Sequence, residues 1–242
     1  MGRTLVIGDV HGAYKALEQI FERAAITTND KIIFLGDYVD GWSQSVAVID
    51  FLIDLKSKYN CVFMLGNHDE LLLDWLKTGI GNELWLMHGG KITAEEYSAI
   101  TDEKLECHIQ FLESLEDYHL DDNNKLFLHA GFTNLKGVTK EHFSKMFYWD
   151  RTLWETALVT DDSLDKNDIT YPKRLKLYNE IFIGHTAVTL INETTPVNKA
   201  CVWNIDTGAA FKGPLTVIDA DTKEFWQSDP VYRLYPDEKG RN

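Results

Sequence analysis

The sequence predicts an α/β protein with the layers α/β/β/α, in which two mixed β-sheets pack face to face between outer helices. Two observations support this prediction. In the first two thirds of the chain, short apolar runs alternate with segments whose apolar residues recur at helical spacing. After Tyr171, the chain changes to short β segments separated by Gly, Pro and Asp, which indicates a second sheet.

Each expected element rests on a local pattern of apolar residues. Strands are predicted at residues 5–7, 32–35 and 62–65, each ending at a glycine loop, and later at residues 181–183, 200–205 and 215–219. Helical spacing links two sets of apolar residues, which are Leu17, Ile20, Phe21 and Ala24, and Val48, Leu52 and Leu55. A helix is therefore expected after each of the first two strands.

The pattern is helical over about residues 70–116, where Leu105, Ile109, Leu112 and Leu115 share one face. This block predicts a helical insertion beside the strand ends. No Gly/Ser run and few prolines interrupt the 242 residues, so one domain over residues 1–242 is expected. Residues 160–168 are acidic without periodicity and predict a surface loop.

Composition narrows the possible partners. The chain has 38 acidic and 24 basic residues, a net charge of −14, and an acidic surface repels a nucleic-acid backbone.

The three cysteines form no C-x-x-C pattern and are expected to be reduced. No signal segment precedes the first strand, and no apolar stretch approaches about 18 residues. We expect a cytoplasmic protein, no membrane association, and a monomer or weak oligomer.

Polar side chains of a particular kind follow the predicted strands. Five loops supply six candidate metal ligands: Asp9, His11, Asp37, Asn67, His129 and His185. Loops at the carboxyl ends of strands converge on one point in α/β proteins, so these groups are expected to meet. Carboxylate, imidazole and amide ligands without a thiolate suit manganese, iron or zinc better than calcium, and they exclude an iron–sulfur cluster.

Six ligands are too many for one tetrahedral ion and too few for two saturated octahedral ions. We therefore predict two divalent ions, manganese before iron or zinc, with open positions for water and substrate. Asp37 is the natural bridge because a carboxylate has two oxygens, while Asp9 and His11 would serve the first ion. Two ions about 3.5–4 Å apart can activate water for in-line attack at phosphorus, which predicts a phosphoesterase.

The departing oxygen in such a reaction needs a proton. His68 lies directly beside the proposed ligand Asn67 and is the candidate general acid. Asp40 is too close in sequence to Asp37 for both to bind the same ion easily, so we expect it to orient the His68 ring. The predicted catalytic residues are therefore His68 and Asp40.

These residues stand in five motifs: Gly-Asp-x-His-Gly at 8–12, Gly-Asp-x-Val-Asp at 36–40, Gly-Asn-His-Asp at 66–69, His-Ala-Gly at 129–131 and Gly-His at 184–185. In this order, over residues 8–186, they resemble the calcineurin-like metallophosphoesterase superfamily. Within it they resemble the phosphoprotein phosphatase branch, which contains lambda-type protein phosphatases and symmetrical diadenosine tetraphosphatases. The resemblance implies the sandwich fold, a two-metal site bridged by Asp37, and His68 as proton donor assisted by Asp40.

One position departs from that branch. Its second motif usually continues with an arginine that contacts the substrate phosphate, whereas Gly41 and Trp42 follow Asp40 here. Glycine supplies neither the charge nor the orientation of a guanidinium, so either another cation takes over or the substrate is held differently. Trp42 could stack on a base or pack against the following helix, and packing is favoured because tryptophan buries a large area.

Two further segments resemble the family. Residues 148–151 match a segment that supplies a phosphate-binding arginine, so we expect Arg151 to contact the substrate phosphate together with Asn67. The alternative for Arg151 is a surface ion pair with Asp150 or Glu155. Residues 85–90 resemble a Trp and Gly-Gly segment, in which His88 is expected to be a loop histidine without a metal role rather than a pocket residue.

Three functions follow from these patterns. The favoured one is a metal-dependent serine/threonine protein phosphatase acting on a phosphorylated protein or peptide. The alternative is a bis(5'-nucleosyl)-tetraphosphatase-like enzyme, which would use the same metals on a nucleotide or other small phosphoester. The third is a non-catalytic binding module with the same fold, against which the complete ligand set and His68 both count.

Overall fold

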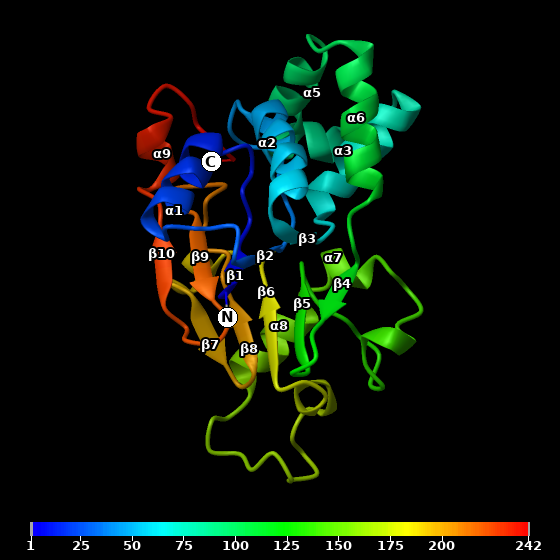
Figure 1. Cartoon of the computed structure of the whole chain (residues 1–242). Coiled ribbons are helices and arrows are strands. Elements are labelled where there is room, and N and C mark those ends of the chain that lie inside the picture. Colours follow the sequence, from blue (N-terminus) through cyan, green and yellow to red (C-terminus); the bar gives the residue numbers. More distant parts are fainter. Residues whose placement is uncertain (1, 242) are drawn as a thin grey trace.

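Two five-stranded sheets lie face to face in the computed structural model, which describes residues 2–241 (Figure 1). The first sheet has the order β10-β9-β1-β2-β3. Its strands are β1 (Thr4–Ile7), β2 (Lys31–Phe34), β3 (Asn60–Phe63), β9 (Thr216–Asp219) and β10 (Phe225–Gln227). The first three run parallel, whereas β9 and β10 are antiparallel to their neighbours, so the sheet is mixed as predicted.

The second sheet has the order β4-β5-β6-β8-β7. Its strands are β4 (Tyr118–Leu120), β5 (Lys125–Leu128), β6 (Glu180–Ile183), β7 (Val197–Lys199) and β8 (Val202–Asn204). The three central strands are parallel, and β4 and β7 pair antiparallel at the edges. Parallel strands direct their carboxyl ends to the same side, which is where the candidate ligands of both sheets lie.

One strand does not lie where the sequence analysis placed it. The run at 215–219 was expected in the second sheet, but β9 belongs to the first, where Val217 pairs with Ile7 and Asp219 with Leu5. The physical reason is that β1 is completely buried, so its second edge needs a partner for its backbone hydrogen bonds. An apolar run predicts a buried strand but does not identify the edge that it joins.

Three apolar layers hold the four-layer sandwich together. Between the sheets, Val6, Ile33 and Ile218 of the first sheet face Phe127 and Phe182 of the second. The rings of Phe127 and Phe182 stack with centroids 5.1 Å apart. The other two apolar clusters lie on the outer face of each sheet, beneath the helices.

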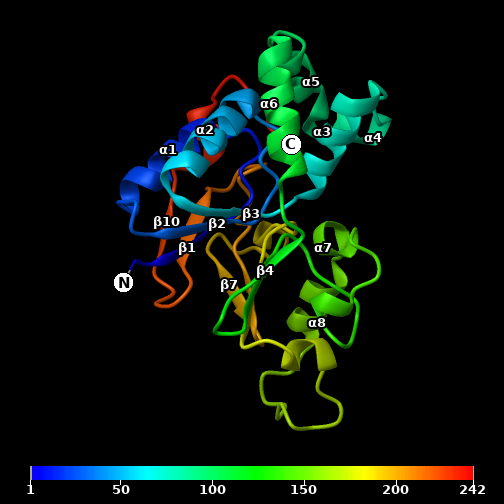
Figure 2. The same ribbon diagram turned by 45° about the vertical axis from the view of Figure 1, so that its right-hand side comes forward.

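The helices cover the two outer faces separately. Over the first sheet lie α1 (Tyr14–Arg23) and α2 (Ser45–Lys58), and over the second lie α7 (Met146–Trp149) and α8 (Thr152–Val159). Figure 2 shows the sheets between these two pairs. The short helix α9 (Val231–Leu234) lies beside α1 (Figure 1). Three 3-10 turns complete the described helices: Val138–Lys140, Lys173–Lys176 and Val188–Ile191.

The predicted helical insertion is present as a block above the ends of β2 and β3 (Figure 1). It consists of α3 (Asn67–Thr78), α4 (Glu83–Trp85), a π-helical stretch (Leu86–Gly90), α5 (Lys91–Tyr97) and α6 (Asp102–Glu113). The buried face of α6 consists of His108, Phe111 and Leu112, whereas Leu105 and Leu115 are only half-buried. Both ring nitrogens of the buried His108 have polar partners, since Tyr97 Oη lies 2.9 Å from Nδ1 and Asp50 Oδ1 lies 3.1 Å from Nε2.

The three cysteines are free, as expected. Residues 160–168 lie in an irregular, largely exposed segment. Among residues 2–241, no helix has both the length and the apolar character needed to cross a membrane.

A partly buried ion pair joins the starts of β1 and β2. Arg3 donates from Nε to Asp30 Oδ1 at 3.1 Å and from Nη2 to Oδ2 at 2.8 Å. Hydrogen bonding from Arg3 holds the pKa of Asp30 well below its usual value, although burial acts in the opposite direction. The charged form of Asp30 therefore stabilises the folded chain.

We expect Asp30→Asn to lower the free energy of unfolding by about 1–3 kcal/mol at neutral pH, because a charge-assisted pair is lost. The folded-state pKa is depressed, so this contribution is present above the unfolded-state pKa of about 3.9 and is lost as pH falls through the folded-state value. Urea unfolding of wild type and variant at several pH values measures the difference in their free energies of unfolding. The difference should shrink steadily below about pH 4, and a difference independent of pH would contradict the assignment.

Candidate metal centre and active site

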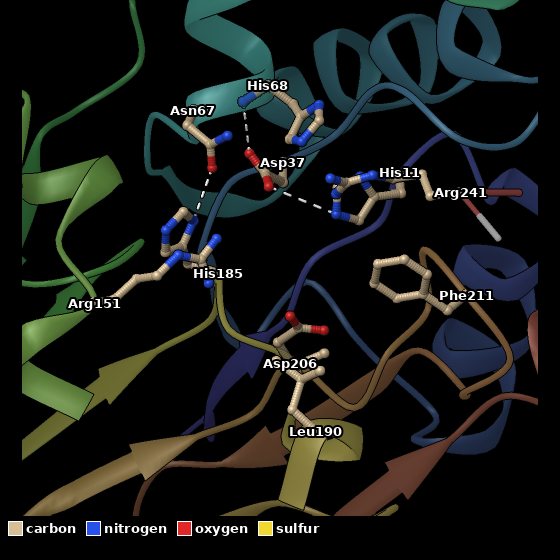
Figure 3. A pocket seen from close by; sticks show the side chains of 11 residues that line it. His11, Asp37, Asn67, His68, Arg151, His185, Leu190, Asp206, Phe211 and Arg241 are labelled. Carbon is tan, nitrogen blue, oxygen red and sulfur yellow. Dashed lines mark hydrogen bonds and ion pairs between the residues drawn. The ribbon is translucent and has the colours of Figure 1, made fainter. Parts of the chain in front are cut away.

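The six predicted ligands meet at the carboxyl ends of the central strands. Asp9 and His11 follow β1, Asp37 follows β2, and Asn67 begins α3 directly after β3. From the second sheet, His129 follows β5 and His185 follows β6. Figure 3 shows Asp37 between His11 on one side and Asn67 with His185 on the other. The structure thus brings together the ligands that sequence reasoning expected to converge.

Four ligand atoms surround one point. His185 Nδ1 lies 2.8 Å from Asn67 Oδ1, and His129 Nε2 lies 3.2 Å from each of those atoms. Asp37 Oδ2 lies 3.4 Å from His129 Nε2. Two imidazole nitrogens, an amide oxygen and a carboxylate oxygen at these separations are typical of ligands that share one cation.

A second group lies on the other side of Asp37. His11 Nε2 is 3.6 Å from Asp37 Oδ2 and 3.9 Å from Asp9 Oδ2. Asp9 Oδ2 accepts a hydrogen bond from the His185 backbone N–H at 3.0 Å, but the buried Asp9 Oδ1 has no hydrogen-bond partner. An unpaired buried carboxylate oxygen is costly, and a cation at this position would satisfy it. The residues present therefore fit two divalent ions that share Asp37.

Hydrogen bonds to backbone carbonyl groups orient the imidazole rings of His11 and His129. His11 Nδ1 lies 3.1 Å from Val39 O and 3.0 Å from Asp40 O, so this nitrogen donates its proton to carbonyl groups. His129 Nδ1 likewise lies 2.8 Å from Leu35 O. In each ring the Nε2 lone pair is left facing the cluster, which is the arrangement that metal-binding histidines usually have.

Four residues of the site have a left-handed backbone. The φ angles are +52° for His11, +53° for Asp37, +72° for Asp40 and +67° for His185. Residues other than glycine adopt this region at a cost of order 1–3 kcal/mol, and such residues cluster at functional sites. The surrounding fold therefore offsets the cost of these backbone conformations, which direct the side chains inward.

Burial sets the charge state of the cluster before any cation binds. Burial is the main cause that raises the pKa of Asp9 well above its usual value, and the charge of Asp206 adds to it. Burial also raises the pKa of Asp206 to about 6. Burial is the largest single effect on His129 and opposes its charge, but the charges of Asp37 and Asp9 together with hydrogen bonds outweigh burial and raise the pKa of His129 to about 10. Together these residues form a buried acidic pocket in which protonated His129 carries a positive charge. A bound divalent ion would displace this proton and supply the positive charge instead.

His68 and Asp40 form the predicted pair. His68 Nδ1 lies 2.6 Å from Asp40 Oδ2, and both side chains are buried. A ring nitrogen of His68 lies within 4.8 Å of ligand atoms of His11 and Asp37. Trp85 also donates from Nε1 to Asp40 Oδ2 at 2.6 Å, so the helical block helps to hold the carboxylate. Asp40 thus orients His68 so that one ring nitrogen faces the cluster.

Asp69 joins the loops that carry the second and third motifs. Its Oδ2 accepts from the backbone N–H groups of Asp37 at 2.8 Å and Gly66 at 2.9 Å, and its Oδ1 accepts from Tyr38 N at 2.8 Å. A Cβ at Gly66 would lie 2.1 Å from Asp37 N, so only glycine permits this approach. These contacts fix Asp37 relative to Asn67.

A family comparison agrees with this geometry. The model of the family described as "Calcineurin-like phosphoesterase" matches residues 2–195, about four fifths of the chain. The chain belongs to the calcineurin-like phosphoesterase family. This family match indicates that the chain is a hydrolase, and it does not favour the non-catalytic binding module.

Curated relatives of this phosphoesterase carry a more specific name. It is 30% identical to the asymmetrical bis(5'-nucleosyl)-tetraphosphatase PrpE of Anoxybacillus flavithermus, covering 88% of each chain. It is 27% identical to the protein of the same name from Oceanobacillus iheyensis, covering 91% of this chain and 89% of the relative.

Solved structures of other proteins share the fold. A metallophosphoesterase from Sphaerobacter thermophilus aligns with a TM-score of 0.57 at 17% identity, covering 97% of this chain and 94% of that one. A protein serine/threonine phosphatase from Saccharomyces cerevisiae aligns with a TM-score of 0.58 at 17% identity, covering 94% of this chain and 80% of that one.

The structure separates the alternatives that the sequence left open. Arg151 lines the pocket and donates from Nη1 to Thr186 Oγ1 at 2.9 Å instead of pairing with Asp150 or Glu155. Trp42 is completely buried, where its ring stacks on Tyr235 with centroids 5.3 Å apart. The expected burial of Trp42 is confirmed, with Tyr235 of the C-terminal segment as its stacking partner in place of the following helix, and stacking on a substrate base is excluded for it.

His88 lines the groove beside Asn67 and His68, which was the less favoured alternative for this residue. The cause is a break in helical geometry at His88 and Gly89, which turns this segment toward Gly41.

Sequence reasoning assigned no role in the site to four residues of the phosphoesterase. Trp85 and Asp69 hold the catalytic pair and the loops, and Asp206 and Arg241 line the pocket. Asp206 follows β8 as the other acids follow their strands, so its position after the run at 200–205 was an available signal. Arg241 carries no local signal, because only the folded chain brings it to the site.

We expect Asp69→Asn to weaken manganese binding by about 10- to 100-fold, because an amide nitrogen would face backbone donors and loosen the loop that holds Asp37. Titration calorimetry measures the affinity. Asp74→Asn, on the exposed side of the same helix, is the matched control and should bind like wild type. Equal affinity for Asp69→Asn and wild type would contradict the role assigned to Asp69.

Proposed function

We propose that this phosphoesterase is a metal-dependent hydrolase of dinucleoside tetraphosphates. The observation that supports the proposal most strongly is a groove of about 710 Å³ that opens directly from the metal ligands and carries both aromatic and cationic side chains. The curated relatives named tetraphosphatases agree with this function over most of the chain. A dinucleotide needs more room and a base-stacking surface, whereas a single phosphoryl group needs only the metal pocket.

Trp149 is the candidate base-stacking residue in this groove. Its side chain is 39% exposed, and its Nε1 donates to Glu70 Oε2 at 2.9 Å. Its ring meets the ring of His185 edge to face at 6.4 Å, which places it beside the metal ligands. Leu84 is also strongly exposed along the same groove. An indole that is fixed at one edge and open on a face suits stacking on a nucleobase.

The serine/threonine protein phosphatase function, which the family resemblance of the sequence favoured, is now the second candidate. The yeast protein serine/threonine phosphatase is a distant structural neighbour, and 17% identity supports the shared fold only. The metal chemistry suits both substrates, so substrate choice depends on the walls of the groove.

The roles of the site residues follow from the geometry. Asp9, His11 and Asp37 would hold one ion, and Asp37 with Asn67, His129 and His185 would hold the other, with manganese as the proposed metal. Bound divalent ions would polarise the phosphoryl group and lower the pKa of water. Among the side chains, His68 would donate its proton to the departing oxygen, while Asp40 keeps the ring oriented.

Arg151 and the Asn67 amide would hold oxygens of the attacked phosphate. The Arg151 guanidinium is positioned by Thr186 and reaches the pocket from the turn between α7 and α8 (Figure 3). Hydrolysis then breaks the bond between phosphorus and the bridging oxygen, and water supplies the new oxygen. Asymmetrical cleavage of the tetraphosphate would yield a nucleoside triphosphate and a nucleoside monophosphate.

The first test compares kcat/KM of the manganese-loaded protein on diadenosine tetraphosphate, a phosphothreonine peptide and p-nitrophenyl phosphate. We expect the dinucleotide to have the largest value. His68→Asn should lower kcat on the dinucleotide by about 10²-fold, because the leaving oxygen loses its proton donor, while manganese content is unchanged. A larger kcat/KM on the phosphopeptide would instead favour the protein phosphatase.

A second test concerns the groove. Trp149→Ala should raise KM for diadenosine tetraphosphate by about 10-fold, since base stacking contributes about 1–3 kcal/mol, and Trp149→Phe should retain most of the affinity. The same variants should hydrolyse p-nitrophenyl phosphate at nearly the wild-type rate, because that substrate does not reach the groove. An equal loss on both substrates would show that Trp149 supports the site and does not bind a base.

A further inference from the structure

An arginine from the other end of the chain lies beside Gly41. We propose that Arg241 holds a phosphate oxygen of the substrate on the side of the pocket opposite Arg151, and that the glycine at position 41 leaves the space for it. This inference deepens the proposed function and rests on phosphoester hydrolysis at this site. It does not depend on which phosphoester is the natural substrate.

The backbone around Gly41 leaves room for one long side chain. A Cβ at Gly41 would lie 3.3 Å from Arg241 Cγ, so the stem of Arg241 passes directly over this position. On another side, a Cβ at Gly89 would lie 2.8 Å from Gly41 N. The φ of Gly41 is +119°, which side chains rarely adopt. A side chain at position 41 would therefore displace Arg241 or strain the loop.

Contacts on several sides hold the segment that carries Arg241. Arg241 N donates to Ala210 O at 2.9 Å, and its guanidinium lies over the Phe211 ring at 5.4 Å. Tyr235, earlier in the segment, stacks on the buried ring of Trp42, and a Cβ at Gly240 would lie 2.6 Å from the same ring. Trp42, which follows Gly41 in the sequence, thus helps to hold the segment that brings in the arginine.

The guanidinium is held in place but its charge is not neutralised. Arg241 Nε is buried and has no hydrogen-bond partner. Among residues 2–241, no carboxylate lies within 4.0 Å of the Arg241 guanidinium, whereas Arg3, Arg23 and Arg174 each have such a partner. A positioned cation with an unused donor is suited to an anionic ligand, because a phosphate would supply both the charge and the acceptors.

Arg241 lies beside the place where the reaction would occur. Arg241 lines the metal pocket together with His11 and Arg151, and it also lines the adjoining groove. In Figure 3, Arg151 and Arg241 enter the pocket from opposite sides of Asp37. The guanidinium of Arg241 therefore borders the metal pocket, where a phosphoryl group would lie.

Two guanidinium groups facing each other select a ligand with several negative oxygens. A tetraphosphate chain offers oxygens both at the attacked phosphorus and along the adjoining phosphates, and Arg241 borders both the pocket and the groove. The net charge of −14 makes such local cations more important, because the rest of the surface repels the substrate.

The test uses the complete manganese-loaded chain, with p-nitrophenyl phosphate as substrate. Arg241→Ala should lower kcat/KM by about 10- to 100-fold, the expected effect of removing a charge-assisted contact to phosphate. Arg241→Lys should recover only part of the loss, because an ammonium cannot bind two oxygens in a planar fork. Arg233→Ala, an exposed arginine in the same C-terminal segment, is the matched control and should remain within about twofold of wild type.

Two further readouts separate phosphate binding from a structural role. Titration calorimetry with inorganic phosphate should show an affinity for Arg241→Ala lowered by a similar factor, with unchanged manganese stoichiometry. Low millimolar guanidinium chloride should restore part of the Arg241→Ala activity and leave the control unchanged. Unchanged phosphate affinity, or a loss of activity that guanidinium does not restore, would overturn the inference.

The role of Arg241 can be tested separately from the proposed nucleotide function. If p-nitrophenyl phosphate shows the predicted pattern while diadenosine tetraphosphate is not hydrolysed, the proposed nucleotide function fails and the role of Arg241 stands. If the dinucleotide is hydrolysed equally well by Arg241→Ala and wild type, the role of Arg241 fails and the nucleotide function stands.

Discussion

The contacts of the buried Asp37 carboxylate depend on the arrangement of both sheets. Its Oδ1 accepts from the backbone of His68 at 2.9 Å, while its Oδ2 lies 3.6 Å from His11 Nε2 and 3.4 Å from His129 Nε2. His11 and Asp37 follow strands of the first sheet, and His129 follows a strand of the second. These distances exist only when the sheets pack face to face with their strand ends aligned. The apolar layer between the sheets therefore determines the geometry of the site.

Local patterns predicted the parts of the molecule that depend on local sequence. Short apolar runs followed by Gly-Asp or Gly-Asn predicted the first strands and the acidic ligands, because strand ends and their loops are encoded within a few residues. The partner of β9 and the position of Arg241 depend on contacts between distant segments, which a single sequence does not display. The contact between His108 and distant Asp50 likewise joins separate segments, so apolar spacing alone did not predict that this polar residue belongs to the buried face of α6.

The metal ligands and the substrate contacts have different structural origins. The ligands and His68 come from the strand ends and the adjoining start of α3, and they suit any phosphoester. The feature proposed to distinguish a dinucleotide from a phosphopeptide lies on the rim, where Trp149 borders the groove, whereas Arg151 and Arg241 line the pocket and would contact the phosphate of either substrate. Motifs therefore identified the chemistry, whereas the preference for a protein substrate came from a resemblance that the motifs alone do not decide.

The central claim is that one carboxylate joins two divalent ions. Electron paramagnetic resonance of the protein with two equivalents of manganese tests it directly, because ions about 3.5–4 Å apart are exchange-coupled. The account predicts the broad multiline spectrum of a coupled pair in wild type and its loss in Asp37→Ala. A six-line spectrum of isolated manganese in wild type at full loading would contradict the shared site.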